Sequence, residues 1–396
     1  MSEIYKITVP CHFGMEAVLK REIYDLGYEI EKTDNGKVTF QGDAEAIVRA
    51  NLFLSTTERV LINVAEFRAC TFEEFFQGIK ACEWERYLPR DARFWVAKAT
   101  SINSKLFSTK DIQSIAKKAI VERLKEKYHI NWFEENGADY PIRINIMKDH
   151  VLVGLDSSGV SLHKRGYRPK SGIAPISETL AASIINLTPW NRERILVDPF
   201  CGSGTFVIEA AMKAACIAPG LNRDFSSMKW DNMISAKEWS ENRQEAKSFI
   251  NTDIDTDIQA YDIDDRVLKL ARSSAKNAGV EHLIHFQKRD VKDLRHPKKY
   301  GFIITNPPYG ERLEDKEKLP ELYKTFGDSF GNLIEWSAYV ITPYENIEKD
   351  FGKKATKKRK IYNGMIKTNV YSFEGAKPPK KRLQENDYEK DHIGHK

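Results

Sequence analysis

The strongest constraint on the fold lies between residues 194 and 344, where apolar strands alternate with amphipathic helices. The stretch RILVDPF (194–200) reads as a strand that runs directly into a glycine-containing loop and then a helix. Further strands are predicted at 257–262, 285–290, 300–310 and 337–344. Strands that alternate with helices form mostly parallel sheets covered by helices on both faces. We therefore expect a doubly wound α/β domain, with ligands at the carboxyl ends of its strands.

The first 156 residues predict two small α+β units instead. In the first unit, strands are expected at 5–11, 37–42 and 60–69, with helices between them near 15–23 and 43–54. In the second unit, we expect a strand at 94–100, a helix over 108–128 and a hairpin over 141–156. Apolar residues three and four positions apart indicate the helices, and alternation of apolar and polar residues indicates the strands.

Composition is that of an ordinary globular protein. The chain of 396 residues is 41% hydrophobic and 30% charged, and no apolar run approaches the ~20 residues that a membrane-spanning helix needs. Charges interrupt the first 25 residues, so no signal peptide is predicted. Five cysteines without a C-x-x-C pair favour a reducing, cytoplasmic compartment. No metal site is expected, because His282, His285 and His296 lack a ligand spacing.

Positive charge is concentrated in two stretches. The net charge is only +5, but residues 351–383 contain eleven Lys or Arg and one acid. Residues 158–170 add four cations and no acid. Such clusters attract phosphate, although a solvated surface is the simpler alternative. The predicted RNA phosphate contacts are Lys164, Arg165, Arg168, Lys353, Lys354, Lys357, Lys358 and Arg359.

The loop Asp198–Thr205 (DPFCGSGT) is the first candidate site. Two glycines after a strand allow a ligand to approach the backbone closely at the start of a helix. The G-x-G-x-x-G pattern of dinucleotide sites is not met, because Val207 stands where its third glycine would be. A nucleotide-type ligand other than NAD is the prediction, and a purely structural turn is the alternative.

The second candidate site is Asn306-Pro307-Pro308-Tyr309, which follows the apolar strand FIIT. Consecutive prolines make this corner stiff. It would hold the Asn306 side chain and the Pro307 carbonyl together as hydrogen-bond acceptors beside the flat face of Tyr309. An exocyclic amine on a planar base suits such a site, because its N–H groups meet the acceptors while its ring stacks on tyrosine. A turn without function is the alternative.

DPFCGSGT followed about a hundred residues later by NPPYGERL resembles the class I S-adenosylmethionine-dependent amino-methyltransferases. With its N-terminal units, the chain is similar to the bacterial THUMP-domain RNA methyltransferases, including the large-subunit (23S) rRNA guanine-N2 methyltransferase family. The resemblance implies a Rossmann-like domain whose mostly parallel sheet ends in an antiparallel hairpin. The implied domains are 1–65 (ferredoxin-like), 66–156 (THUMP, RNA-binding), 157–170 (basic linker), 171–376 (methyltransferase) and 377–396 (polar tail).

The resemblance also implies S-adenosylmethionine as the cofactor and assigns its contacts. At the methionine and sulfonium end these are Asp198, Phe200, Gly202 and Gly204, with Thr205 in the same loop; Asp262 would bind the ribose and Asp290 the adenine amine. Helix capping is the alternative for Asp262 and Asp290. A long insertion, roughly 217–254, separates the glycine loop from Asp262, which leaves Asp264 as a substitute ribose ligand.

The implied reaction is methylation of guanine N2 in 23S rRNA, with Asn306, Pro307, Pro308 and Tyr309 as the catalytic residues. Neither a strong base nor a metal is required, because orientation and electrostatic support carry this displacement. The target base must be single-stranded or flipped out, since a paired base is out of reach. Alternatives are tRNA guanine-N2 methylation, DNA adenine-N6 methylation, and a non-catalytic RNA-binding factor in ribosome assembly.

Overall fold

The computed structural model describes residues 3–168, 176–310 and 313–379, with the side chains of 313–316 excepted. Several predictions fall partly outside these ranges. They concern the end of the basic linker and the start of the methyltransferase domain (169–175), Glu311 and Arg312 of the NPPYGERL motif, and the tail from residue 380.

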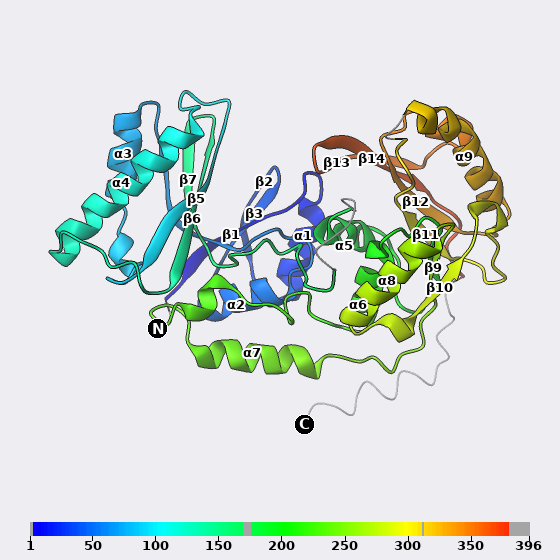
Figure 1. Ribbon diagram of the computed structural model, residues 1–396, viewed down its shortest axis with the longest axis horizontal. Coiled ribbons are helices and arrows are strands. Elements are labelled where there is room, and N and C mark those ends of the chain that lie inside the picture. The colour runs from blue at the N-terminus through cyan, green and yellow to red at the C-terminus, as the bar shows by residue number, and fades with distance from the viewer. Residues whose placement is uncertain (1–2, 169–175, 311–312, 380–396) are drawn as a thin grey trace.

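The N-terminal half contains a seven-stranded sheet in the order β2-β3-β1-β4-β7-β6-β5 (Figure 1). Its strands are β1 (Tyr5–Pro10), β2 (Ile30–Asp34), β3 (Lys37–Gly42), β4 (Leu61–Arg68), β5 (Arg93–Ile102), β6 (Asp139–Met147) and β7 (His150–Asp156). Its helices are α1 (Glu16–Asp25), α2 (Ala44–Phe53), α3 (Phe72–Lys80) and α4 (Thr109–Tyr128), with a short 3₁₀ turn η1 (Trp84–Arg86). The predicted α+β character of this half is confirmed.

The C-terminal half contains a second seven-stranded sheet in the order β10-β9-β8-β11-β12-β14-β13. Its strands are β8 (Leu196–Asp198), β9 (Ile258–Asp262), β10 (Ile284–Lys288), β11 (Phe302–Thr305), β12 (Ser337–Thr342), β13 (Lys357–Asn363) and β14 (Ile366–Phe373). Its helices are α5 (Glu178–Leu187), α6 (Thr205–Ala214), α7 (Ala236–Ser248), α8 (Asp265–Asn277), α9 (Leu313–Gly331) and α10 (Ile347–Asp350). Short 3₁₀ turns are η2 (Ser226–Lys229), η3 (Glu281–Leu283) and η4 (Val291–Asp293).

This second sheet is doubly wound, as predicted. Strands β10, β9, β8, β11 and β12 pair in parallel, while β14 runs antiparallel to both β12 and β13. In β11, Phe302 and Ile304 pack into the core under α5, α6 and α8, whereas Ile303 packs into the core under α9. Apolar residues on both faces of a strand require cover on both sides, which explains the continuous apolar run in this strand.

The two N-terminal units share one sheet, which the sequence did not predict. Strand β4 pairs with β1 on one side and with β7 on the other. The predicted boundary between residues 65 and 66 therefore falls inside β4 and divides a strand rather than a linker. Backbone hydrogen bonds across the β4–β7 pair make the two predicted N-terminal units one continuous sheet.

The insertion at 217–254 crosses from the C-terminal domain to the N-terminal one. Trp230 is buried in the N-terminal core, where its ring stacks on Tyr140 with a 4.9 Å separation of centroids. Trp239 is buried in the same core, and Arg49 of α2 pairs with Glu245 of α7. The insertion leaves the order of β8 and β9 in the sheet intact and fastens the two domains together.

A polar cluster forms a second junction between the domains. The Glu58 carboxylate lies 3.2 Å from His12 Nε2 and 2.9 Å from His163 Nδ1, and the hydroxyl of Thr179 in α5 donates to it. Burial opposes ionisation of Glu58, but the hydrogen bonds from His12, His163 and Thr179 outweigh it and lower its pKa. A third link joins Arg359 of β13 to the carbonyl oxygen of Gly14 at 2.7 Å.

All five cysteines lie in the described part of the chain and are free thiols. No helix in that part is long and apolar enough to cross a membrane. Within the same residues, no group of three or more His, Cys, Asp or Glu side chains is arranged to hold a metal ion.

Candidate functional site

The glycine loop begins where β8 ends, at the carboxyl edge of the sheet. Gly202 (φ +49°) and Gly204 (φ +80°) both adopt left-handed backbone conformations that favour glycine. A Cβ on Gly204 would come within 3.0 Å of the Ala271 side chain, so this glycine is needed for packing of α6 against α8. A Cβ on Gly202 would meet no atom within 4 Å, which leaves space for a ligand on that side of the loop.

Asp198 is a buried carboxylate at the start of this loop, with only 1% of its surface exposed. It accepts hydrogen bonds from the Thr305 hydroxyl at 2.6 Å and from the Phe200 amide at 3.1 Å. Burial raises the pKa of Asp198 to about 7 despite these bonds. Among the described residues no cationic side chain forms an ion pair with it, so a cationic ligand group fits the site.

Asp262 follows β9 and closes the other side of the loop. One carboxylate oxygen accepts from the Gly202 amide at 3.0 Å, and the other accepts from the Asp264 amide at 3.0 Å. Asp264 itself caps α8 and pairs with Arg266 at 2.8 Å. These contacts place Asp262, rather than its substitute Asp264, against the glycine loop.

The remaining predicted cofactor residues lie around the same strand ends. Asp290 follows β10, accepts from the Lys292 amide at 3.1 Å and caps η4, so the capping alternative holds at least for one of its oxygens. The Phe200 ring packs edge-on against Phe326, with centroids 5.4 Å apart. Thr205 is buried at the start of α6, and Arg168 donates to its hydroxyl.

The Asn306–Tyr309 corner stands directly beside the glycine loop. Strand β11 pairs in parallel with β8, and the Thr305–Asp198 hydrogen bond joins the ends of these two strands one residue before Asn306. Asn306 Oδ1 accepts a 2.5 Å hydrogen bond from the Tyr309 hydroxyl. Pro307 is buried and Pro308 is exposed, while Asn306 and Tyr309 are half-buried. Burial raises the pKa of Tyr309, which keeps its hydroxyl protonated as a donor.

Thr305 and Asn363 are site residues that the sequence did not single out. The side-chain amide of Asn363 donates to the Tyr309 hydroxyl at 3.2 Å, across a separation of 54 residues. Thr305 could have been found from its place between an apolar strand and Asn306. For Asn363 the only signal was the Asn-Gly turn at 363–364, which indicates a hairpin but not its neighbour.

The predicted RNA contacts of the linker need correction. Arg165 is only 4% exposed, and its guanidinium donates to the carbonyl oxygens of Leu162 and Ser55 and lies 3.5 Å from Glu209. Arg168 is half-buried, donates to Thr205, and lies 3.3 Å from Glu178. Buried carboxylates need charged or hydrogen-bonding partners, and these two arginines supply them. Because both guanidinium groups are engaged within the protein, they are not available to bind an RNA phosphate. Lys164 is exposed, as predicted.

The predicted lysine-rich stretch lies at the edge of the second sheet. Lys353 and Lys354 follow α10, and Lys357, Lys358 and Arg359 lie on the edge strand β13. All five are exposed. Lys357 pairs with Glu374 at 3.2 Å, and Arg359 forms the link to Gly14. The last three of these five residues therefore lie on an edge hairpin, whereas Lys353 and Lys354 precede it. Contact of these side chains with RNA remains a prediction.

Comparison with known proteins identifies the two domains. A family model described as the RMKL-like methyltransferase domain matches residues 165–372, and models of the RlmL ferredoxin-like domain and the THUMP domain match 6–61 and 69–156. The chain belongs to the RMKL-like methyltransferase family. The second sheet is therefore the core of the methyltransferase domain, and S-adenosylmethionine is its cofactor.

Three relatives illustrate this membership. YpsC of Bacillus subtilis, named as a candidate RNA methyltransferase, is 47% identical over 96% of this chain and 99% of its own. Ribosomal RNA large subunit methyltransferase K/L of Methylococcus capsulatus is 31% identical over 92% of this chain but only 50% of its own length. The structure of SMU.472, titled as a candidate methyltransferase complexed with SAH, has a TM-score of 0.89 and 42% identity over 96% of this chain and all of that one.

The residues present fit this cofactor. When bound, S-adenosylmethionine supplies a methyl group activated by a positively charged sulfonium. The uncompensated Asp198 carboxylate suits a cation, and the open space at Gly202 admits a ligand against the backbone. Asp262 holds the Gly202 amide in place. The predicted cofactor contacts of these three residues stay predictions, and the structure gives each one a consistent position.

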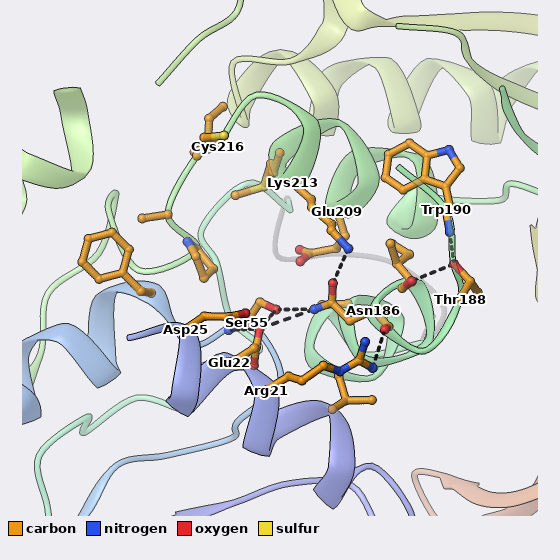
Figure 2. A pocket seen from close by; sticks show the side chains of 18 residues that line it. Arg21, Glu22, Asp25, Ser55, Asn186, Thr188, Trp190, Glu209, Lys213 and Cys216 are labelled. Carbon is orange, nitrogen blue, oxygen red and sulfur yellow. Dashed lines mark hydrogen bonds between the residues drawn. The ribbon is translucent and has the colours of Figure 1, made fainter. Parts of the chain in front are cut away.

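A hollow of about 480 Å³ lies elsewhere, between α1 of the ferredoxin-like unit and α5 and α6 of the methyltransferase domain (Figure 2). Its polar side chains bond to one another across the junction. Across the junction, the Asn186 side chain donates to the Ser55 hydroxyl at 3.1 Å and Arg21 donates to the Asn186 carbonyl at 3.2 Å. Within the methyltransferase domain, Lys213 donates to the Asn186 side chain at 2.6 Å. Burial raises the pKa of Glu22, which accepts from Ser55. The hollow therefore belongs to the domain junction and not to the strand ends that carry the chemistry.

Proposed function

We propose that this methyltransferase transfers a methyl group to the exocyclic N2 of a guanine in 23S rRNA. The observation that carries the proposal is the position of the Asn306 amide oxygen and the Tyr309 ring beside the cofactor loop, fixed by the Thr305–Asp198 hydrogen bond. The THUMP unit and the ribosomal RNA methyltransferase relatives support RNA as the substrate. The free cysteines support a cytoplasmic compartment.

The corner orients a weak nucleophile. The lone pair of a guanine amino group is delocalised into the ring, so the residues must hold the nitrogen rather than deprotonate it. Asn306 Oδ1 and the Pro307 carbonyl accept its two N–H groups, while the Tyr309 ring stacks on the base and contributes on the order of 1–3 kcal/mol. Acceptors on both N–H groups raise electron density at the nitrogen and aim it at the donor.

Substrate entry brings a second donor to an acceptor that is already engaged. In the structure the Tyr309 hydroxyl donates to Asn306 Oδ1, so an incoming amino group must use the second lone pair of this oxygen or displace the hydroxyl. A guanine that is single-stranded or flipped out can do this, since its amino group is not engaged in base pairing. Loops and bulges in RNA present such bases at the lowest cost.

The test is incubation of the full chain with labelled S-adenosylmethionine and separate pools of undermodified rRNA, tRNA and DNA, followed by nucleoside analysis and mapping. We expect N2-methylguanosine in 23S rRNA, formed more slowly by about 10²-fold or more with Asn306→Ala. N2-methylguanosine in the tRNA pool alone would favour the tRNA alternative, and N6-methyladenine in DNA would overturn the guanine assignment. Absence of product from every pool would favour a non-catalytic RNA-binding role.

A further inference from the structure

The hairpin formed by β13 and β14 ends in an exposed apolar side chain, and Asn363 beside its turn contacts the catalytic corner. Asn363 pairs with Ile366, so the turn consists of Gly364 and Met365 alone. Gly364 has φ +59°, which matches the two-residue hairpin turn with glycine in its first position. The Met365 side chain is 97% exposed at the tip of this turn.

The tip is tied to the active site by a chain of hydrogen bonds. Asn363, two residues before Met365, donates to the Tyr309 hydroxyl at 3.2 Å, and Tyr309 donates to Asn306 Oδ1 at 2.5 Å. Ile361 and Thr368 pair with each other across the hairpin and are fully buried. The base of the hairpin is therefore anchored in the methyltransferase core, and its tip has a fixed position relative to the target-base site.

Charge around the tip matches a nucleic acid. Lys360 lies over the Tyr362 ring at 5.4 Å, and Tyr362 pairs with Lys367 across the hairpin. All three side chains are exposed, and Ile366 adds a second exposed apolar group next to Met365. An apolar tip flanked by lysines and an aromatic ring combines an unstacking side chain with phosphate contacts.

We propose that Met365 acts as a wedge that enters the RNA stack where the target guanine leaves it. An apolar side chain between base steps stabilises a flipped-out nucleotide by occupying the gap that the base vacates. Asn363 then couples the position of the wedge to the Tyr309–Asn306 pair that receives the base. The proposal rests on RNA being the substrate, as proposed above, and adds how a paired guanine is reached.

The test compares two forms of one 23S rRNA fragment that contains the guanine methylated by the full chain. In one form the guanine is paired in a stem, and in the other it faces an abasic site. Met365→Ser should lower kcat/KM for the paired form about tenfold or more and change the abasic form less than about twofold, because only the paired form needs unstacking. Met365→Leu, which keeps an apolar tip, should retain most of the activity on both forms.

Equal losses on both fragments, or no loss on either, would overturn the wedge. The unmodified chain, Met365→Ser and Met365→Leu should have the same cofactor affinity in calorimetry. Equal affinity shows that the two variants are folded. If the unmodified chain methylates neither fragment nor any other RNA, it is the proposed function that fails rather than the wedge. If the unmodified chain methylates both fragments and Met365→Ser has no effect on either, the wedge proposal fails while the proposed function stands.

Discussion

The glycine loop and the Asn306–Tyr309 corner lie at the ends of neighbouring strands, yet they differ in how their polar groups are used. In the loop, Asp262 already accepts from the Gly202 amide, and Asp198 is anchored by Thr305 without an ion pair to any cation in the described part of the chain. In the corner, the Asn306 oxygen is already paired with the Tyr309 hydroxyl.

This difference shows which half of the site is prepared in advance. The loop is held by its own hydrogen bonds, so cofactor binding needs little rearrangement. The corner already uses one lone pair of its acceptor, so a substrate amine must share the Asn306 oxygen with the Tyr309 hydroxyl or displace that hydroxyl. Its closed form keeps a half-buried amide oxygen from being left unpaired when no base is present. Changes in the corner should therefore affect methyl transfer, whereas changes in the loop should affect cofactor affinity.

The largest expected effect is that of Asn306→Ala. Removing the amide oxygen deletes one of two acceptors for the target amine and should lower kcat by about 10²-fold or more. Because the corner is not part of the loop, the dissociation constant of S-adenosylmethionine should change less than about twofold. Single-turnover methyl transfer and calorimetry measure the two quantities.

Asn332→Ala is a matched control, since this exposed asparagine lies in the turn after α9 and its side-chain amide donates to the Asp328 carbonyl. It should leave both quantities unchanged. Loss of cofactor binding with Asn306→Ala would remove the distinction between loop and corner.

The next prediction compares the contribution of the Tyr309 ring to catalysis with that of its hydroxyl. Tyr309→Ala removes the stacking surface and should lower kcat/KM about 10- to 100-fold, in line with the usual contribution of base stacking. Tyr309→Phe keeps the ring and frees Asn306 Oδ1, so it should lower kcat/KM less than about fivefold. If both variants lose activity equally, the hydroxyl has a role beyond closing the corner.

Local sequence patterns were sufficient to predict the strand, the glycine loop and the proline corner that form the candidate site. Leu196 and Val197 face opposite cores of the methyltransferase sheet, as a two-sided apolar strand requires, and the glycine loop and proline corner are each defined by consecutive residues. Their adjacency followed from the rule that parallel strands bring their carboxyl ends to one edge.

Contacts between distant residues were beyond the reach of these patterns. The sequence presents Arg165 and Arg168 as part of a basic run, but folding brings the carboxylates of Glu209 and Glu178 beside them. Pairing of β4 with β7 joins residues about 90 positions apart, and Trp230 reaches a core in another domain. Periodicity describes one element at a time, so it carries no information on such partners.

A third effect concerns pH and the loop. The pKa of Asp198 is raised to about 7, so the carboxylate becomes ionised as pH rises from 6 to 8, and a cationic ligand binds the ionised form. Affinity for S-adenosylmethionine should therefore increase with pH, by at most about tenfold per unit below pH 7, and level off above. Because the folded state favours the neutral acid, the stability contribution of Asp198 falls as pH rises from about 4 to 7.

Asp198→Asn should flatten the affinity profile between pH 6 and 8. Asp224→Asn is the control, since this side chain is 90% exposed and pairs with Arg243 in the insertion. Calorimetric titrations at several pH values measure this affinity. If the affinity of Asp198→Asn still rose with pH as in the unmodified chain, a group other than Asp198 would be responsible for the pH dependence.

The smallest effect tests the edge of the methyltransferase sheet. Replacing Lys353, Lys354, Lys357 and Lys358 with glutamine should reduce the slope of log affinity for RNA against log salt by up to about 3, since each phosphate contact contributes roughly 0.7–0.9. The same charge change at the exposed Lys237, Lys247, Lys269 and Lys276 on α7 and α8 serves as control. Equal changes in slope for the two variants would mean that RNA affinity depends on the total charge of the protein and not on lysines at this edge. A selective change would instead place the RNA backbone along this edge of the sheet. The hairpin on that edge contacts the Asn306–Tyr309 corner through Asn363, so the surface that holds the RNA would be connected to the part of the site that receives the base.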